Sequence, residues 1–396
     1  MRLPVFLMTM RRRILWTLYG SNFITALGMW FFLPLLPIFI GRKGGSAALV
    51  GAVFAAGLLA NAAIRYPAGW AADRFGTRVV MVGAMAAYAV LFLAYLLPLP
   101  LGMFVALRFV HGAAAGAFWP AANGLIAEAT PPVGRGRAYG FMQSTNMAGM
   151  LLGPAVGGFV ALFNLNAVFV MSAVTCGVAA VALAMLPRAR LEQPVELPLP
   201  QRAMAIARRL VPLLLLGAGT SYMIGTFDTI WPLYMTFRGA STFAVGLSFT
   251  AFALPAMLLS AQAGSLGDRL GTRRLIIGAL IATALFSAVY PFVTSVAWLI
   301  GLGLIEGALT ISGAPSLIAE VSRVAPSGQQ GRTQGLFQTV QTVIQIAGAL
   351  AGGALFAVSP TYAFLAISAI CLVGAGTGVL PRTAARRRVT EAPTRP

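Results

Sequence analysis

Five ionisable residues lie inside long apolar stretches of this sequence: Arg65, Arg108, His111, Asp228 and Glu306. Burying such a group in an apolar medium is costly, so its presence there usually has a functional reason. A buried carboxyl group can take up and release a proton, and a nearby cation can tune that exchange or hold an anion. We rank Asp228 first and Glu306 second as the groups that exchange protons.

Other interpretations of these residues stay open. Arg108 could form a locking ion pair with one of the acids, and His111 could be a hydrogen-bonded packing residue or a proton relay. Arg65 lies one turn from a loop, so its side chain can reach the aqueous boundary. Softer polar and indole side chains in apolar stretches could line a cavity or merely bridge helices: Asn22, Thr25, Trp30, Gln143, Asn146, Trp231, Gln338, Gln341 and Gln345.

The composition identifies the solvent around these groups. The chain of 396 residues is 59% hydrophobic and 9% charged, with a mean hydropathy of +0.85. A bilayer-spanning helix needs about 20 apolar residues, and lipid-facing backbone must satisfy its own hydrogen bonds. We therefore predict an all-α membrane protein whose spans are residues 14–40, 47–70, 79–97, 102–127, 138–161, 166–186, 211–237, 243–264, 274–293, 297–319, 333–357 and 361–381.

The net charge of +19 is distributed as in a membrane protein. The cations gather at the N-terminus, in alternate loops, in the central segment and in the tail, whereas only Arg42, Lys43 and Arg238 fall in the other loops. The positive-inside rule then predicts a multi-pass protein of the cell membrane with both termini in the cytoplasm. The basic loops are expected to contact lipid headgroups, and no nucleic-acid partner is expected.

A charged loop motif occurs twice, 264 − 69 = 195 residues apart. Its spacing is Gly-x-x-x-Asp-Arg-x-Gly-Thr-Arg, and each copy lies between two apolar stretches. The second glycine of each copy permits a tight turn that a side chain would obstruct. The residues concerned are Gly69, Asp73, Arg74, Gly76 and Arg78 in the first copy, and Gly264, Asp268, Arg269, Gly271 and Arg273 in the second.

The same offset relates other residues and predicts two homologous halves. Cys176 and Cys371 are 195 residues apart and are read as small packing residues, without a disulfide or a metal site. We predict an N-terminal six-helix bundle over residues 1–187, a cytoplasmic linker over 188–210 and a C-terminal six-helix bundle over 211–396. Duplicated halves with binding at their interface are a recurrent plan of transporters.

These motifs resemble those of the major facilitator superfamily over essentially the full length of the chain. The repeated loop resembles the family signature between the second and third helices. Arg108, Gly112 and Gly116 resemble a second family motif in the fourth helix. The glycine-rich segment of the fifth helix resembles the antiporter motif of twelve-helix drug:proton exporters; its residues are Gly149, Gly153, Pro154, Gly157 and Gly158.

The resemblance implies the family fold, with two six-helix bundles related by a pseudo-two-fold axis, and roles for the motifs. The loop aspartates would latch the loop to the opposite half during transport, although a static salt bridge that tightens the turn is an alternative. In this family helices 1, 4, 7 and 10 line the cavity, so Arg108, His111, Asp228 and Glu306 would cluster there. His111 and Glu306 share the 195 offset and could face each other across the pore.

The glycine-rich segment has its own physical interpretation. Small residues on one face let a neighbouring helix approach closely, and Pro154 removes one helical hydrogen bond. The segment could form a stiff seam between the halves that prevents leakage. Ordinary small-residue packing would explain the same pattern.

The function expected is secondary active transport, and no enzyme or cofactor is indicated. The sequence carries neither a phosphate-binding loop nor paired metal ligands, so the energy must come from an ion gradient or from the substrate's own gradient. We expect a monomer that exports drug-like or metabolite compounds in exchange for protons. The alternatives are a symporter or facilitator of sugars or organic anions, a lipid translocase, and a receptor that does not transport.

Overall fold

The computed structural model describes residues 5–130, 135–186, 203–310, 313–324 and 330–379. Within these ranges the chain is helical apart from short turns. Its α-helices are α1 (Val5–Phe32), α2 (Leu36–Arg42), α3 (Ala47–Phe75), α4 (Thr77–Ala94), α5 (Met103–Ala129), α6 (Arg135–Phe163), α7 (Leu165–Ala184), α8 (Ala203–Phe237), α9 (Thr242–Leu270), α10 (Thr272–Val289), α11 (Val296–Thr310), α12 (Gly313–Val324), α13 (Gln330–Val358) and α14 (Pro360–Val379). Short 3-10 turns lie at Leu33–Leu35 and Tyr290–Phe292.

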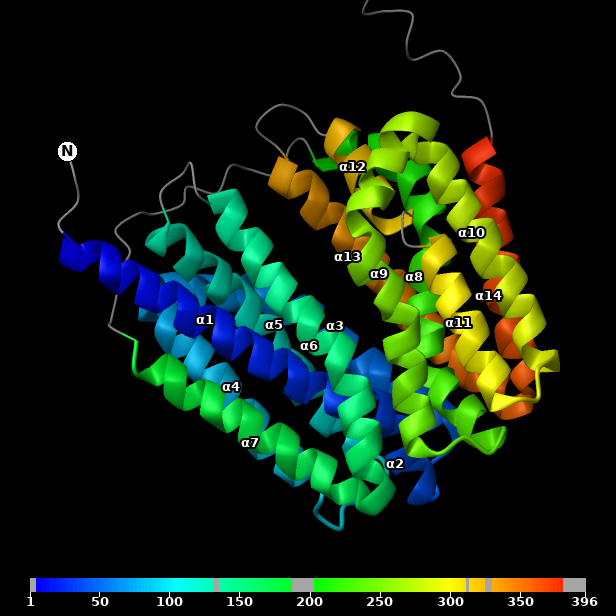
Figure 1. Ribbon diagram of the computed structural model, residues 1–396, viewed down its shortest axis with the longest axis horizontal. Coiled ribbons are helices and arrows are strands. Elements are labelled where there is room, and N and C mark those ends of the chain that lie inside the picture. The colour runs from blue at the N-terminus through cyan, green and yellow to red at the C-terminus, as the bar shows by residue number, and fades with distance from the viewer. Residues whose placement is uncertain (1–4, 131–134, 187–202, 311–312, 325–329, 380–396) are drawn as a thin grey trace, which may run out of the picture.

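The helices form two bundles, as predicted. In the first, α1 packs on α6 and α7, α3 on α5, and α4 on α5 and α7. In the second, α8 packs on α13 and α14, α9 on α11, and α10 on α14. Figure 1 shows the two bundles side by side, with the chain passing from one to the other after α7. The second set of contacts repeats the first, because the helix patterns of the two halves repeat.

Every predicted apolar stretch coincides with a helix or a pair of helices. Among the described residues, nine helices are long and apolar enough to cross a membrane, and 242–255 and 296–310 form shorter apolar helices. The stretch predicted at 297–319 is divided between α11 and α12. The last residues of the predicted linker, 203–210, belong to α8, whereas 187–202 lie outside the described residues.

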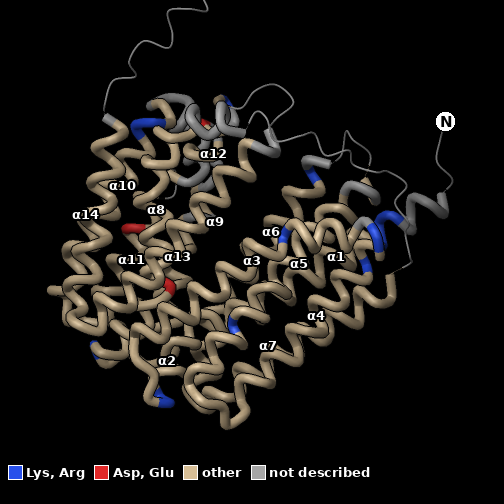
Figure 2. The backbone as a smooth tube through the Cα atoms, turned by 180° about the vertical axis from the view of Figure 1, so that it is seen from behind, with Lys and Arg blue, Asp and Glu red and all other residues tan. Residues whose placement is uncertain are grey.

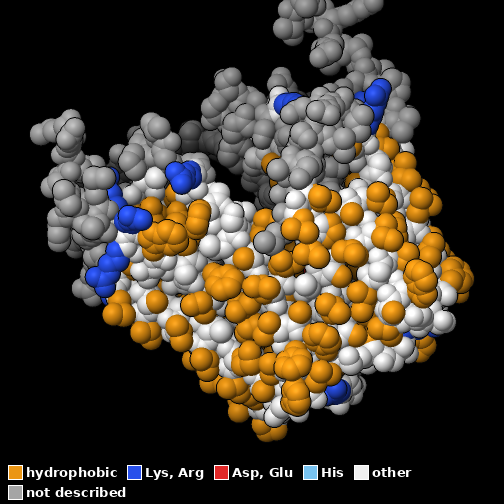
Figure 3. Space-filling model, viewed as in Figure 1, with side chains coloured by type: hydrophobic (Ala, Val, Ile, Leu, Met, Phe, Trp, Pro, Cys, Tyr) orange, Lys and Arg blue, Asp and Glu red, His pale blue; other side chains and the backbone are white. Residues whose placement is uncertain are grey.

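The outer surface matches a bilayer environment. Large apolar side chains are exposed along α4, α7, α10 and α14, and Figure 3 shows orange apolar atoms spread over the described face with few charged atoms among them. Figure 2 shows that charge is sparse along the middle of the helices and that Lys and Arg lie mainly near their ends. Exposed apolar surface is favourable here because lipid, rather than water, is the surrounding medium.

The two loop motifs end in turns that only glycine adopts comfortably. Gly76 has φ +94° between α3 and α4, and Gly271 has φ +86° between α9 and α10. A Cβ atom is strained at such positive φ values. The structure therefore confirms the tight turn predicted for each motif copy.

Replacing Gly76 by alanine is expected to destabilise the protein by about 1–3 kcal/mol, the usual cost of forcing a side chain into this backbone region. Thermal unfolding of the purified protein in detergent measures the effect. Gly83→Ala is the matched control, because Gly83 is helical and has no neighbouring atom within 4 Å of an added Cβ. Equal unfolding temperatures for the two variants would contradict the assigned turn.

The two bundles meet along two helix pairs, α3 with α13 and α6 with α9. The close contacts lie in the part of each helix farthest from the motif turns: Gly51 lies against Ala349 and Gly353, and Gly158 against Thr242. In Figure 1 the bundles converge at that end and diverge toward the end that carries Gly76 and Gly271. Among the described residues, the close backbone contacts between the bundles therefore gather at one end of the molecule.

Candidate functional site

The glycine-rich segment of α6 contacts two different neighbours. Added Cβ atoms at Gly149, Gly153 and Gly157 would collide with α1, which belongs to the same bundle. Only Gly158 would collide with α9 of the opposite bundle. The expectation that the whole segment forms the seam between the halves therefore needs correction, because Gly149, Gly153 and Gly157 recur every four residues on one helix face, whereas Gly158 lies on the adjacent face.

The seam itself combines close backbone approach with hydrogen bonds. The hydroxyl of Thr242 donates to the carbonyl of Gly158 at 3.0 Å, and that of Thr250 donates to the carbonyl of Leu151 at 2.8 Å. An added Cβ at Gly246 would collide with the carbonyl oxygen of Pro154. The α6–α9 contact is thus held by backbone atoms of both halves, which leave little room for adjustment.

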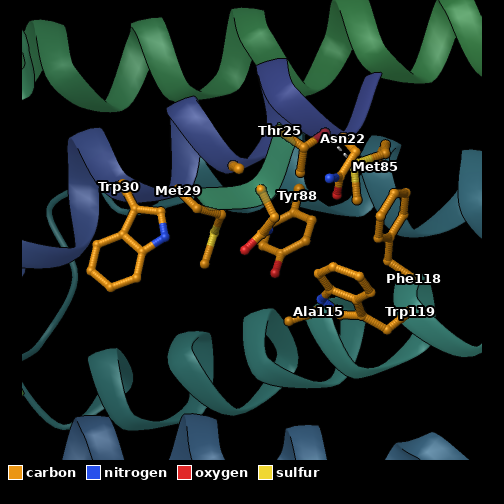
Figure 4. A pocket seen from close by; sticks show the side chains of 11 residues that line it. Asn22, Thr25, Met29, Trp30, Met85, Tyr88, Ala115, Phe118 and Trp119 are labelled. Carbon is orange, nitrogen blue, oxygen red and sulfur yellow. Dashed lines mark hydrogen bonds between the residues drawn. The ribbon is translucent and has the colours of Figure 1, made fainter. Parts of the chain in front are cut away.

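A cavity of about 230 Å³ lies in the N-terminal bundle between α1, α4, α5 and α6. Figure 4 shows its side chains around a common centre. Several residues proposed from the sequence as cavity-lining are among them. The lining residues are Asn22, Thr25, Ala26, Met29, Trp30, Met85, Tyr88, Ala115, Phe118, Trp119 and Asn146.

Sequence reasoning missed seven of the eleven residues that line this pocket. Met29, Met85, Tyr88, Phe118 and Trp119 lie in apolar stretches where most such residues face lipid or core. No local signal separates them from the other methionines and aromatic residues of the chain. These residues line the same pocket only because α1, α4 and α5 pack together.

Arg108 and Asp228 lie on opposite sides of the boundary between the bundles. Arg108 is 9% exposed, and its guanidinium lies 5.9 Å and 5.7 Å from the ring centres of Phe32 and Phe54. Asp228, on α8, is half-buried. The charge of Arg108 acts on the Asp228 carboxyl from the other bundle.

Neither charge is neutralised by an ion pair within the described residues, where the ion pair found joins Arg323 to Glu320. Among the described residues, Arg108 therefore forms no ion pair with an acid that could lock the structure. Asp228 also lacks a hydrogen-bond partner among the described side chains. An unpaired carboxyl group at the boundary is free to change its proton occupancy or its partner during a conformational change.

His111 and Glu306 are both buried: aromatic rings of its own bundle surround His111, and Glu306 lies against Tyr290 of its own bundle. His111 is fully buried among Phe32, Tyr88, Phe92 and Tyr95, and neither ring nitrogen has a hydrogen-bond partner. It is therefore not the hydrogen-bonded packing histidine considered above. Its closest ring is Tyr88, at 4.4 Å, which also lines the pocket.

Glu306 is 1% exposed, and one of its carboxyl oxygens accepts a hydrogen bond from the Tyr290 hydroxyl at 2.6 Å. The other carboxyl oxygen has no partner. The expectation that His111 and Glu306 face each other across an open pore is not met, because both side chains are sealed inside their bundles. Equivalent positions in a duplicated chain share a depth but need not share a cavity.

Part of the aromatic cluster around His111 is repeated in the second half, a feature that sequence reasoning overlooked. Four ring contacts of the first half recur 195 residues later, whereas Tyr88 and Phe92 correspond to Thr283 and Ser287. The paired positions are Phe32 and Phe227, Phe39 and Tyr234, Tyr95 and Tyr290, Phe169 and Phe364, and finally His111 and Glu306. The offset that revealed the loop motif would have revealed this cluster as well.

The equivalent tyrosines of the two halves differ, because the Tyr290 hydroxyl has a hydrogen-bond partner and the Tyr95 hydroxyl has none. Tyr290→Phe is expected to destabilise the protein by about 1–3 kcal/mol, because it leaves both oxygens of buried Glu306 without partners. Tyr95→Phe is the matched control, since the Tyr95 hydroxyl is buried without a partner and its loss removes no bond. Thermal unfolding in detergent measures both, and an equal effect of the two changes would refute the importance of the Tyr290–Glu306 bond.

The loop motifs are described in part. Arg74 stacks on Trp70 and Phe75 at 5.3 Å and 5.8 Å, and Arg78 donates a hydrogen bond to the carbonyl of Ala184 at the end of α7. A cation is favourable at a helix C-terminus. The side chains of Asp73, Gly264, Asp268 and Arg269 lie outside the described residues, so the latch stays a prediction.

The remaining polar predictions divide between packing and solvent. The Trp231 indole donates to Ser248 at 2.8 Å and does not line the pocket. Gln341 accepts a hydrogen bond from Ser221 at 2.7 Å, which joins α8 to α13.

Two other polar side chains predicted from the sequence are exposed. Gln143 is one of them, and Arg65 is the other and donates to Asn61 at 2.9 Å. Arg65 is thus positioned as expected for a side chain near the boundary.

Known proteins provide an independent comparison. The profile described as Major Facilitator Superfamily matches residues 18–243 and 213–395. The multidrug resistance protein MdtG of Citrobacter koseri is 28% identical over 370 residues, covering 87% of this chain and 88% of that protein. The multi-drug resistance efflux pump PmrA of Streptococcus pneumoniae is 27% identical over 382 residues, covering 91% and 92%.

Solved structures support the fold. The crystal structure of the nucleoside transporter NupG matches with a TM-score of 0.80 at 13% identity, covering 92% of this chain and 98% of that chain. The profile match extends over both bundles, as does the structural match. This chain therefore belongs to the Major Facilitator Superfamily and is a multi-pass membrane transporter rather than an enzyme.

Proposed function

We propose that this protein exports small drug-like or metabolite compounds in exchange for protons, by alternating access between its two bundles. The observation that carries the proposal is Asp228, a half-buried carboxyl group without an ion-pair partner among the described residues, subject to the charge of Arg108 from the opposite bundle. A group at this boundary changes its surroundings when the bundles move. It can therefore link proton binding to that movement.

The substrate class is supported by the relatives and by the pocket. MdtG and PmrA are named as a multidrug resistance protein and a multi-drug efflux pump. Methionine and aromatic side chains in the pocket can repack around compounds of different shapes. Glu306 and His111 are assigned secondary roles, because each is sealed inside its own bundle.

The proposal includes an orientation and an assembly. The end that carries Gly76 and Gly271 faces the cytoplasm, with both termini on that side of the cell membrane, as the distribution of cations predicts. The functional unit is a monomer of two bundles, 1–187 and 211–396, joined by the segment 188–210. The loops that contain Asp73 and Asp268 act as latches between the bundles when the cytoplasmic end closes.

The proposal is tested on the purified protein in liposomes that enclose a pH-sensitive dye. Gradients of cationic drugs, sugars and organic anions are imposed one at a time, and proton movement is recorded. We expect proton movement with cationic or amphipathic compounds and none with sugars. Proton movement driven by sugars or anions would instead assign a nutrient transporter, and the absence of coupled movement with every compound would reject proton-coupled export.

A further inference from the structure

The pocket of the N-terminal bundle is too small to hold a whole drug-sized molecule. Its volume is about 230 Å³, whereas sites that enclose such ligands usually measure about 300–1,000 Å³. The pocket therefore suits one rigid part of a substrate, while the rest of the molecule lies between the bundles. Its shape and chemistry limit what that part can be.

Hydrogen-bond donors without partners dominate the polar lining. The indole nitrogens of Trp30 and Trp119 have no partner among the described residues, and an indole N–H can only donate. In Figure 4 both nitrogens lie on the side of their rings that faces the middle of the pocket, where the Tyr88 hydroxyl also ends. The Tyr88 hydroxyl likewise makes no hydrogen bond within the described part of the chain.

Two amide side chains and the hydroxyl of Thr25 complete the polar lining, and Thr25 donates to the sulfur of Met85 at 3.2 Å. Asn22 uses its NH₂ group to donate to the carbonyl of Met142 and to the hydroxyl of Thr145, both at 2.9 Å, so its oxygen is left to face the pocket. Asn146 makes no hydrogen bond to a described residue. Because the two indole groups can only donate, a matching ligand must present a hydrogen-bond acceptor, and a ring carbonyl oxygen is an acceptor that a flat, uncharged ring system can carry.

The rest of the lining is flat and apolar. Met29, Met85 and Phe118 line the pocket together with the two indole rings, and no residue that lines it is charged. Aromatic faces and thioethers favour flat ring systems through stacking and sulfur–aromatic contacts. An uncharged lining offers nothing to offset the desolvation of an ionised group.

We propose that this pocket binds the planar aromatic part of the substrate, in a form that carries a ring carbonyl oxygen and no charge, with Trp30 and Trp119 as the residues that select for the oxygen. The proposed export function is needed only to call the bound compound a substrate. The chemistry of the pocket is argued independently of it. Any charged group of the substrate then lies outside the pocket.

Two probes that differ only in the carbonyl group test the assignment. 9-Fluorenone and fluorene are both flat three-ring compounds, and only the first has a ring carbonyl oxygen. Binding is measured by equilibrium dialysis against the protein in lipid nanodiscs, with empty nanodiscs of the same lipid subtracted. We expect fluorenone to bind about tenfold more tightly, the effect of one neutral hydrogen bond. Equal binding of the two probes by the unaltered protein would overturn the proposal without any variant.

Variants then test whether the N–H groups of Trp30 and Trp119 cause the preference for fluorenone over fluorene. Trp30→Phe combined with Trp119→Phe keeps two aromatic rings and removes both N–H donors, so fluorenone binding should weaken about tenfold while fluorene binding stays unchanged. Trp16→Phe is the matched control, since Trp16 lies on α1 but is 54% exposed and outside the pocket. If the double variant fails to fold, Trp119→Phe alone is used. Discrimination that survives removal of the N–H donors would overturn the assignment.

The failure of this inference differs from the failure of the proposed function. A protein that prefers fluorenone through Trp30 and Trp119 but moves no proton with any compound keeps the pocket assignment and loses proton-coupled export. A protein that exchanges protons for cationic compounds but does not distinguish the two probes loses the pocket assignment alone.

Discussion

Asp228→Asn is expected to abolish substrate movement against a concentration gradient while leaving downhill exchange intact. Asparagine has nearly the shape of aspartate but does not bind or release a proton at physiological pH. The described structure assigns Asp228 no hydrogen bond or ion pair that the change would break. In liposomes with an imposed pH gradient, the variant should therefore equilibrate a substrate without concentrating it, and proton movement should no longer accompany transport.

Thr229→Val is the matched control for this variant. Thr229 is the next residue of α8, is fully buried, and donates its hydroxyl hydrogen to the carbonyl of Gly225 in the same helix at 3.0 Å. Removing that local bond should leave coupling intact, because no titratable group is lost. If Asp228→Asn still concentrates substrate at the normal rate, Asp228 has no part in coupling, and Glu306 becomes the first candidate.

Gly246→Ala is expected to prevent tight closure of the end where the bundles meet and to reduce transport strongly. A Cβ at this position collides with the carbonyl oxygen of Pro154 in the opposite bundle, and both atoms belong to helix backbones that cannot rotate away. Overpacking a close contact costs about 1–3 kcal/mol, which shifts the balance between closed and open states by roughly 5- to 150-fold. The open form at this end should therefore become more populated.

A cysteine introduced in place of Thr242, which lies in the seam and is 7% exposed, reports the opening. Both native cysteines are fully buried, so they contribute little background. A membrane-impermeant maleimide should label this reporter at least about five times faster in Gly246→Ala. Gly278→Ala is the control, because an added Cβ there has no neighbour within 4 Å. Equal labelling rates would show that the seam tolerates the extra atom.

Much of the architecture could be predicted because it depends on composition and on periodicity. A bilayer allows few backbone arrangements, so long apolar stretches had to be helices. The 195-residue offset predicted two bundles, and the family profile and the structural comparison agree with that plan. The turns at Gly76 and Gly271 were also predictable, since positive φ is a local property for which glycine is suited.

The site was less predictable, because small, apolar and aromatic residues do not identify their neighbours. The glycines of α6 indicated close packing, but only the structure shows that Gly149, Gly153 and Gly157 approach α1 and that Gly158 approaches α9. The shared offset of His111 and Glu306 suggested that they face each other, whereas both are buried, His111 among rings of its own bundle and Glu306 against Tyr290. A shared offset reports equivalent positions, and a rotation about the pseudo-two-fold axis relates such positions without placing them in contact.

The sequence by itself therefore determined the membrane environment, the duplicated bundles, the glycine turns and the identity of the buried ionisable residues. The tertiary structure alone decided which aromatic and methionine side chains form the pocket of the N-terminal bundle, where the bundles make their close backbone contacts, and that Arg108 acts on Asp228 across the boundary. The reason is physical. Hydropathy and backbone strain act within a few residues of the chain, whereas a pocket depends on how helices far apart in sequence pack against one another.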